Sequence, residues 1–242
     1  MKYIKIILIS LLLIPNIIYA KSITISEFDL TININDEWDI FTRDNLINND
    51  LLTKYNVQMD EVLNNMKENS IYIDAIMDDY ELFLRGNNEA EINNLTNYKD
   101  SDINLFAEEL MKKTGASDYE LLKSNGITYV KSKYIDSNLG AYLVEYVTIF
   151  NRNNITFTIQ NYNGFPTSEV EKELDEMIKT TTIKLNSLYE KENNSTNFYT
   201  NIIYTGIIGA VVGGLIGFMN TKKKNSKQTT SVSESEKIDK SL

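Results

Sequence analysis

The sequence has no cysteine and no histidine, and only two prolines and one tryptophan among its 242 residues. Without cysteine the chain cannot form disulfides, so its fold depends on side-chain packing and hydrogen bonds. Ser-His-Asp and Cys-His catalysis are excluded within the chain, as are the usual zinc, haem and iron–sulfur ligand sets. Carboxylate chemistry or a hard cation is what remains, and we expect no cofactor.

The composition also bears on the source of the chain. There is no Ser-x-x-Lys sequence and no Gly-x-x-x-x-Gly-Lys phosphate loop. Asparagine, isoleucine and lysine are abundant, as in proteins translated from AT-rich genomes. Together with the missing cysteine, this composition resembles that of surface proteins from low-GC Gram-positive bacteria.

Charge is spread unevenly along the chain, whose net charge is −10. Residues 21–200 hold 31 acidic and 16 basic side chains, whereas residues 220–242 hold three acidic and six basic ones. A domain this acidic repels nucleic acid and anionic lipid head groups but tolerates cationic partners. We therefore expect no nucleic-acid partner, and the surface is typical of a soluble, non-adhesive domain.

The first twenty residues have the order of a secretory signal peptide. Lys2 and Lys5 form a basic start, residues 6–14 are apolar, and Pro15 follows them. Ala20 is suited to precede a cleavage site, so we predict a signal peptide over residues 1–20. Ile18 is larger than the residue usually found at its position, which leaves an uncleaved N-terminal anchor as the alternative.

A second apolar run covers residues 202–219 and contains no charge. As a helix of ~27 Å it would just cross the hydrocarbon core of a bilayer. Lysines follow it, and basic flanks stay in the cytoplasm. No Leu-Pro-x-Thr-Gly-like sorting signal precedes it. We predict a single-pass cell-membrane protein with an extracytoplasmic domain (21–185), a polar stalk (186–201), a transmembrane helix (202–219) and a basic cytoplasmic tail (220–242).

Small residues recur every four positions in the predicted transmembrane helix. One row is Gly209, Gly213 and Gly217, and a second is Gly206, Ala210 and Gly214. Glycine is common in membrane spans, but two such rows also let helices approach closely enough for backbone packing. They indicate a possible homodimer, or a membrane-protein partner, held through this helix.

The pattern of the extracytoplasmic domain predicts an α+β fold, a mostly antiparallel sheet with helices packed on it. We expect helices over residues 59–66, from Ser101 to Gly115, and from Ser168, where Ser168 and Glu171 form a capping box. The last helix has a buried stripe of Val170, Leu174, Met177 and Ile178. Strands are expected over residues 28–34, 71–75 and 80–84, beside an Asn125-Gly126 turn, over 141–160 with 151–154 as a loop, and over 181–185.

This order of elements resembles the PsbP-like α/β/α sandwich, the fold of the photosystem II oxygen-evolving P protein. The matching pieces are a first strand ending at Asp36-Glu37-Trp38, a long hairpin over residues 142–160, and a helix over 168–181 that runs into Thr182-Ile183. The resemblance covers about residues 23–185. That family usually has proline and glycine before the tryptophan, and this chain has neither. The resemblance implies a fold and carries no functional residue across.

The densest acidic group near predicted strands is Asp74, Asp78, Asp79 and Glu81. Two carboxylates across a cleft can hydrolyse a glycoside, but the pattern shows no cleft, so a solvated turn is the favoured interpretation. Residues 100–104 imitate the start of a calcium loop. Its essential glycine and glutamate are replaced by Leu105 and Met111, so a helix cap is favoured there. We predict no catalytic and no metal-binding residue.

Trp38 admits two interpretations. It either packs below the edge of the sheet at a chain corner, or it is exposed and stacks on a carbohydrate. Aromatic residues near strands are mostly core residues, so we predict that Trp38 is buried.

We therefore predict a membrane-anchored, extracytoplasmic and non-catalytic domain that binds a protein or a small ligand at the cell surface. The alternative is a sensor or regulatory subunit that acts through its transmembrane helix with a membrane partner. The tail over residues 220–242 is too short for an output domain, so a signal would need such a partner. A carboxylate-dependent enzyme is the third hypothesis.

Overall fold

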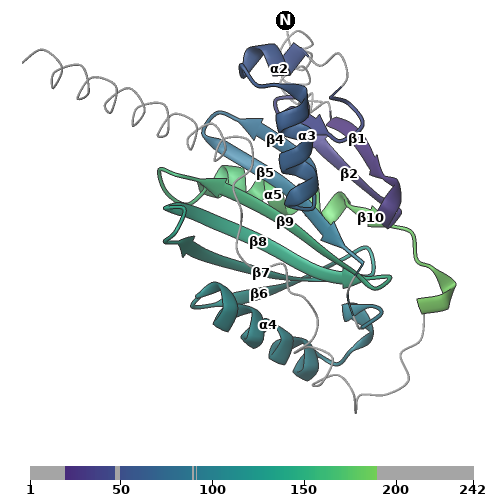
Figure 1. The fold of residues 1–242 in the computed structure, drawn as a ribbon. Helices are drawn as coiled ribbons and strands as arrows, with labels where there is room; N and C mark the ends of the chain where they lie inside the picture. The colour runs from purple at the N-terminus through teal and green to yellow at the C-terminus, as the bar shows by residue number, and fades with distance from the viewer. Residues whose placement is uncertain (1–19, 47–49, 89, 91, 190–242) are drawn as a thin grey trace, which may run out of the picture.

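The computed structural model describes residues 20–46, 50–88, 90 and 92–189, which form two antiparallel sheets with helices packed on them (Figure 1). The larger sheet has the order β3-β4-β5-β9-β8-β7-β6, and the smaller has the order β1-β2-β10. This confirms the α+β class and the antiparallel sheet. The strands are β1 (Ala20–Ile25), β2 (Leu30–Asn35), β3 (Asp39–Thr42), β4 (Ile71–Met77), β5 (Tyr80–Asn87), β6 (Tyr119–Ser124), β7 (Ile127–Asp136), β8 (Ala141–Phe150), β9 (Asn153–Asn161) and β10 (Thr182–Ile183). The helices are α2 (Asp50–Lys54), α3 (Met59–Glu68), α4 (Asp100–Thr114) and α5 (Ser168–Thr180), with short 3-10 turns η1 (Ser26–Phe28), η2 (Leu95–Asn97) and η3 (Ser187–Tyr189).

One face of the seven-stranded sheet is covered by α5 and by the three-stranded sheet. Leu174 and Met177 of α5, Leu30 and Ile32 of β2, and Phe157 of β9 are buried in a single apolar cluster. Strand β2 alternates buried apolar and half-buried polar residues, because successive side chains of a strand point to opposite faces. The predicted stripe of α5 is the part of that helix that enters this cluster.

The opposite face carries α3 and α4, which lie over different parts of the sheet (Figure 1). Met66 of α3 packs in one cluster with Phe83 of β5. Phe106 of α4 packs in another with Val147 of β8. The apolar core on this face is therefore divided in two, and the sheet between its halves is available for other residue types.

Two hairpins of the larger sheet turn on two residues in the left-handed conformation. Asn125 and Gly126 have φ of 51° and 74°, which confirms the predicted turn between β6 and β7. Asn151 and Arg152 have φ of 51° and 63° and join β8 directly to β9. The four-residue loop expected over 151–154 is wrong, because a turn with positive φ at both residues matches the twist of the strands and needs only two.

The start of α5 differs from the predicted capping box. Thr167 is the N-cap, and its hydroxyl accepts a hydrogen bond from the Val170 backbone N–H at 3.4 Å. Ser168 is the first helical residue, and the Glu171 side chain instead forms ion pairs with two lysines of β7. A tertiary contact has replaced the local one that the spacing indicated.

The start of α4 also differs from its prediction. Lys99 is the N-cap and makes no side-chain capping bond, so the cap expected within residues 100–104 is wrong. Asp100 and Asp102 lie in the first turn, where negative charge is favoured by the helix dipole. Gly115 follows the last turn with φ of 77°, as a left-handed C-terminal residue should.

Within the described ranges, no helix is long and apolar enough to cross a membrane. The predicted transmembrane helix, cytoplasmic tail and most of the stalk lie outside those ranges, as do residues 1–19 of the predicted signal peptide. The division of the chain into these segments stays a prediction.

Candidate functional site

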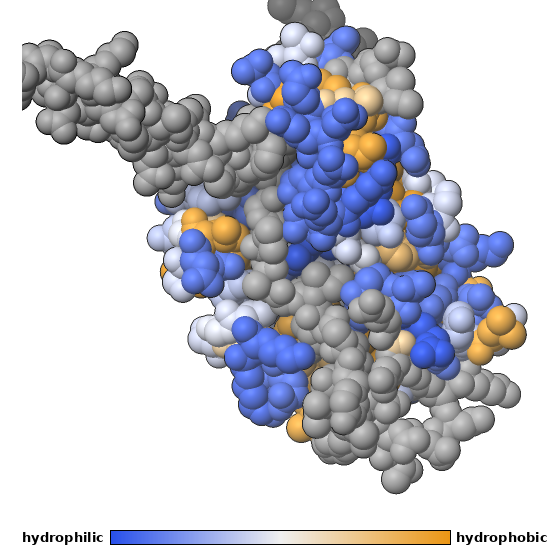
Figure 2. All heavy atoms as spheres, in the orientation of Figure 1, coloured by the Kyte–Doolittle hydropathy of each residue, from blue (hydrophilic) through white to orange (hydrophobic). Residues whose placement is uncertain are grey.

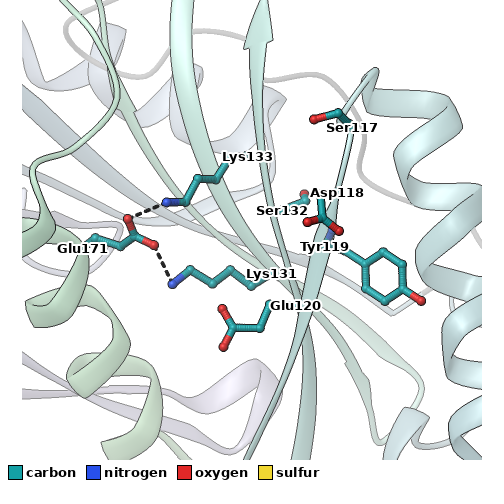
Figure 3. A pocket seen from close by; sticks show the side chains of 8 residues that line it. All are labelled: Ser117, Asp118, Tyr119, Glu120, Lys131, Ser132, Lys133 and Glu171. Atoms are coloured by element: carbon teal, nitrogen blue, oxygen red, sulfur yellow. Dashed lines mark hydrogen bonds and ion pairs between the residues drawn. The ribbon is translucent and has the colours of Figure 1, made fainter.

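A pocket lies at the edge of the seven-stranded sheet, where β7 extends beyond the first residue of its shorter neighbour β6 (Figure 3). Pairing between the two strands runs from Tyr119 opposite Ser132 to Ser124 opposite Ile127. Residues 133–136 of β7 continue further and have no partner strand on that side in the described chain. The pocket has a volume of about 350 Å³ and is lined by residues 117–120, residues 131–133 and Glu171 of α5. We term it the edge pocket.

One carboxylate of α5 holds two lysines of β7 at the edge pocket. Glu171 Oε1 lies 2.8 Å from Lys131 Nζ, and its Oε2 lies 2.6 Å from Lys133 Nζ. Lys131 Nζ also lies 2.8 Å from Asp175 Oδ1, and Asp175 accepts a hydrogen bond from the Tyr146 hydroxyl. The spacing makes this possible, because residues two apart share a strand face and residues four apart share a helix face.

These ion pairs keep the side chains charged. Burial lowers the pKa of Lys131, but its hydrogen bonds to Asp175 and Glu171 outweigh burial and raise the pKa above its usual value. Burial raises the pKa of Glu171, but its bonds to Lys131 and Lys133 hold the pKa below its usual value. A lysine nucleophile or a general base needs a pKa moved towards neutral, and the pKa of each of these two side chains is moved the other way.

The edge pocket has an excess of negative charge. Figure 3 shows Glu120, Glu171 and the two lysines extending towards the same space, while the ring of Tyr119 points away from it. Asp118 is exposed, and its Oδ1 accepts a hydrogen bond from the Tyr119 backbone N–H at 2.8 Å. Three carboxylates therefore line the pocket against two ammonium groups.

Two large apolar side chains are exposed beside the unpaired part of β7. Ile135 is 54% exposed and Phe165 is 42% exposed. Tyr142 lies opposite Ile135 in β8, and its ring packs edge-to-face on Phe165 with 5.1 Å between centroids. The described surface seen in Figure 2 is mainly hydrophilic, with apolar residues in small separate areas. Exposed apolar side chains beside an open strand edge are typical of a surface that another chain covers.

A second polar group is buried on the face that carries α3 and α4. Several side chains that the central strands β5, β8 and β9 turn to this face are polar and have almost no exposure. They are Glu81, Arg85, Glu145, Thr156, Thr158 and Gln160. We term them the polar strip. It runs between the apolar cluster under α3 and the one under α4.

Glu145 lies at the centre of the polar strip. Its Oε1 accepts a hydrogen bond from Thr158 Oγ1 at 3.1 Å and lies 3.4 Å from Arg85 Nη2. Burial raises the pKa of Glu145 above its ordinary value, and the neighbouring Arg85, Tyr134 and Thr158 only partly offset that effect. A buried carboxyl of this kind is costly to keep ionised.

The polar strip is incompletely hydrogen-bonded. Gln160 Nε2 donates to Glu81 Oε2 at 2.6 Å. Oε1 of Gln160, Oε2 of Glu145 and Oγ1 of Thr156 have no hydrogen-bond partner within the described part of the chain. Buried polar atoms without partners lower stability, so the strip is not explained by the stability of the fold.

The fold separates the acidic group singled out from the sequence. Asp78 lies in the β4–β5 turn with φ of 53°, and Asp79 is exposed and accepts a hydrogen bond from Asn163 Nδ2 at 3.0 Å. Asp74 and Glu81 are buried, so the solvated-turn interpretation holds for the first two residues and is wrong for these. Among the described residues no group of three or more His, Cys, Asp or Glu is placed to hold a metal.

Trp38 is buried, as predicted, with 1% of its side chain exposed. Its indole Nε1 donates to Glu173 Oε1 of α5 at 3.1 Å. It therefore joins the corner after β2 to the helix that covers the sheet.

Sequence reasoning missed the edge pocket. A local signal for it exists, because Lys131 and Lys133 are two apart in a strand while Glu171 and Asp175 are four apart in a helix. The predicted helix-packing residues, Gly206, Gly209, Ala210, Gly213, Gly214 and Gly217, lie outside the described ranges.

Comparison with known proteins gives one structural relative to report. No protein-family model and no curated protein matches the chain. The chain is similar to the solution structure of cyanobacterial PsbP (CyanoP) from Synechocystis sp. PCC 6803, with a TM-score of 0.40 and 11% sequence identity. The match covers 70% of this chain and 95% of that one. We take no ligand, partner or residue role from this likeness.

Proposed function

We propose that this chain is a non-catalytic binding domain, anchored at the outer face of a cell membrane through residues 202–219, that captures an extended segment of a protein partner at the edge pocket. The observation that carries the proposal is the open edge of β7 over residues 133–136. A strand added there would complete backbone hydrogen bonds that the edge leaves open and would continue the line of β6.

The side chains around this edge suggest the chemistry of the partner. Ile135 and Phe165 are exposed and would be covered by apolar side chains. The pocket beside them carries more carboxylates than lysines, within a strongly acidic domain. A partner segment that turns both apolar and lysine or arginine side chains to the face shared by Ile135 and Lys133 would match both features, because residues two apart in a strand point to the same face.

The enzyme hypothesis would rest on the polar strip. Glu145 has the raised pKa that a general acid requires. Glycoside hydrolysis also needs a second carboxyl across a substrate cleft. Glu81 and Glu145 are both fully buried, so they support internal hydrogen bonding better than they support turnover.

A sensor or regulatory subunit is the second candidate function, favoured by the two rows of small residues between Gly206 and Gly217. On this hypothesis the transmembrane helix itself contacts the partner. Replacing Gly209 and Gly213 by isoleucine in the full chain would then abolish association, while changes at the edge pocket would leave it intact.

Site-specific crosslinking in native membranes tests the proposed function. A photo-reactive side chain at Ile135 should capture a partner through a segment that mass spectrometry maps to one extended stretch. Leu188 is the matched control, since it is 80% exposed and lies near the β8–β9 turn, at the other end of β8. Ile135→Asp should abolish capture from a reactive group at Phe165, and Leu188→Asp should not. Equal capture from positions 135 and 188 would overturn the proposal.

A further inference from the structure

Two asparagine–glycine pairs lie in different surroundings on the surface of the domain. One is Asn125-Gly126, in the β6–β7 turn, and the other is Asn163-Gly164, between β9 and α5. In such a pair the glycine backbone nitrogen can attack the carbonyl carbon of the asparagine side chain, because the glycine has no Cβ to block the approach. Asparagine is accordingly among the thermally labile residues. Both asparagines are exposed, so exposure does not decide which of them reacts.

The side chain of Asn125 is held by a neighbouring segment. Its Nδ2 donates to the carbonyl O of Lys179 at 2.8 Å and to that of Thr181 at 3.1 Å. Asn125 and Gly126 are also the two residues of a tight turn between paired strands. Attack on this side chain would have to break both hydrogen bonds and distort the turn. The fold therefore protects this pair.

Asn163 lacks these restraints. Residues 162–167 form no helix or strand, and residues 162–166 make no backbone–backbone hydrogen bond within the described chain. The Asn163 side chain makes one hydrogen bond, from its Nδ2 to Asp79 Oδ2 at 3.0 Å, and Asp79 lies in an exposed turn. The Gly164 backbone N–H has no hydrogen-bond partner among the described residues. The attacking nitrogen is therefore unengaged, and the side chain that it would attack is weakly held.

We propose that Asn163 is a site of spontaneous conversion to aspartate and isoaspartate. The Gly164 nitrogen forms a bond to Asn163 Cγ and loses its proton, while the Cγ–Nδ2 bond breaks and the amide nitrogen leaves with a proton as ammonia. Water then opens the resulting succinimide ring. Addition of water at the side-chain carbonyl gives aspartate, and addition at the main-chain carbonyl gives isoaspartate. The reaction needs only this loop and water, so the inference does not depend on the proposed function.

The conversion changes the surface beside β7. A carboxylate oxygen takes the place of Asn163 Nδ2, 3.0 Å from Asp79 Oδ2, and two carboxylates at that distance repel each other. Two residues further on, the exposed ring of Phe165 packs edge-to-face on Tyr142. Displacement of Asn163 from Asp79 moves the loop that carries this ring. The unconverted and converted proteins therefore present different apolar surfaces beside the open strand edge.

Peptide mapping of the aged protein tests the assignment, with Asn125 as the internal control. The full chain, held in lipid nanodiscs, is incubated at mildly alkaline pH and digested with trypsin. Cleavage after lysine and arginine places the two pairs in separate peptides, residues 124–131 and residues 153–172. Mass spectrometry with fragmentation should show conversion at Asn163 at least about tenfold faster than at Asn125, because each hydrogen bond that must open slows the reaction severalfold.

Unfolding in urea separates the effect of the fold from that of the sequence. The two rates should become similar there, since each asparagine then precedes an unrestrained glycine. Equal rates in the folded protein, or faster conversion at Asn125, would overturn the proposal. So would an Asn163 that stays intact in the folded protein for as long as the urea-treated chain takes to convert.

Variants at Asp79 test the local contact and its consequence. Asp79→Ala removes the hydrogen bond to the Asn163 side chain and should speed conversion at Asn163 without changing the rate at Asn125. Asn163→Asp imitates the product, and it should shift the NMR resonances of the Phe165 and Tyr142 rings. Adding Asp79→Asn restores a donor and an acceptor at this contact and should return the resonances towards those of wild type. Ring resonances that are the same in all three proteins would overturn the stated consequence.

Discussion

One face of the seven-stranded sheet buries a continuous apolar cluster, whereas the other buries two apolar clusters with polar side chains between them. In β5, Leu82 and Leu84 enter the apolar cluster beneath α5 and the small sheet, whereas Glu81 and Arg85 enter the polar strip. The neighbouring strand β9 shows the same division. Phe157 and Ile159 enter the apolar cluster, and Thr156, Thr158 and Gln160 enter the polar strip. The same strands thus build a continuous core on one side and a divided one on the other.

The two faces therefore differ in how much they contribute to the stability of the domain. Burying apolar surface is favourable by roughly 25 cal/mol per Å², whereas burying polar groups lowers stability unless every hydrogen bond is made. The face beneath α5 buries apolar side chains in one continuous cluster. The polar strip buries polar atoms, and some of these make no hydrogen bond within the described residues. We therefore expect changes on the apolar face to affect folding most and changes on the strip to affect its pH dependence.

Trp38→Ala should have the largest effect on stability. The side chain is almost fully buried in the apolar cluster, and its loss leaves a cavity and removes the bond to Glu173. Such truncations destabilise by about 3–5 kcal/mol. Denaturant melts of the variant measure this, with Leu188→Ala as an exposed control expected within about 0.5 kcal/mol of wild type. Normal stability of the Trp38→Ala domain would contradict this prediction and would favour the interpretation of Trp38 as a surface recognition residue.

Glu145→Gln should change how stability depends on pH. Because burial raises the pKa of Glu145 above 4.5, the folded protein binds this proton more tightly than the unfolded chain does. Its stabilising contribution is present below pH 4.5 and is lost as the pH rises through the raised value. The glutamine variant carries no such proton, so its free energy of unfolding should rise relative to wild type with increasing pH. Urea melts across pH 4 to 8 measure the difference, and a constant offset would contradict the assignment.

Lys133→Ala should have the smallest effect of the three. Lys133 is about half exposed, and Glu171 keeps its bond to Lys131 in the variant. Exposed pairs contribute about 0.2–1 kcal/mol, less at high salt. Because the pKa of Glu171 is lowered, its pairing stabilises the fold above pH 4.5 and is lost as the pH falls below that. The difference between the variant and wild type in free energy of unfolding should therefore be smaller at pH 3 than at pH 7. Lys172→Ala, an exposed change on α5, serves as the control.

Local patterns sufficed for most elements of the fold. The alternation in β2 and the Asn-Gly turn before β7 depend on neighbours in sequence, and both are present as predicted. Strand β1 was missed, because three of its first four residues are exposed and it has no apolar run of its own. It is a strand because β2 offers it backbone partners from Ala20 to Ile25.

The two candidate sites could not be predicted in the same way. Glu81 and Arg85 alternate with leucines, which reads as a strand with one solvated face, and only the packing of the whole domain buries them. The edge pocket depends on β6 being shorter than β7 and on where α5 crosses the sheet. Neither the difference in strand length nor the crossing point is encoded within one segment.

The tight turn between β8 and β9 has a mechanical consequence. The backbone and side chain of Asn151 make three hydrogen bonds to two other segments: to Asn94 Oδ1 at 2.7 Å, to the Lys184 carbonyl at 2.8 Å and from the Asn186 backbone N–H at 3.1 Å. Tension applied through a C-terminal anchor would reach these bonds before it reached β10, which pairs over only two residues. The turn between β8 and β9 would bear the load first, so β10 would not separate from β2 one hydrogen bond at a time.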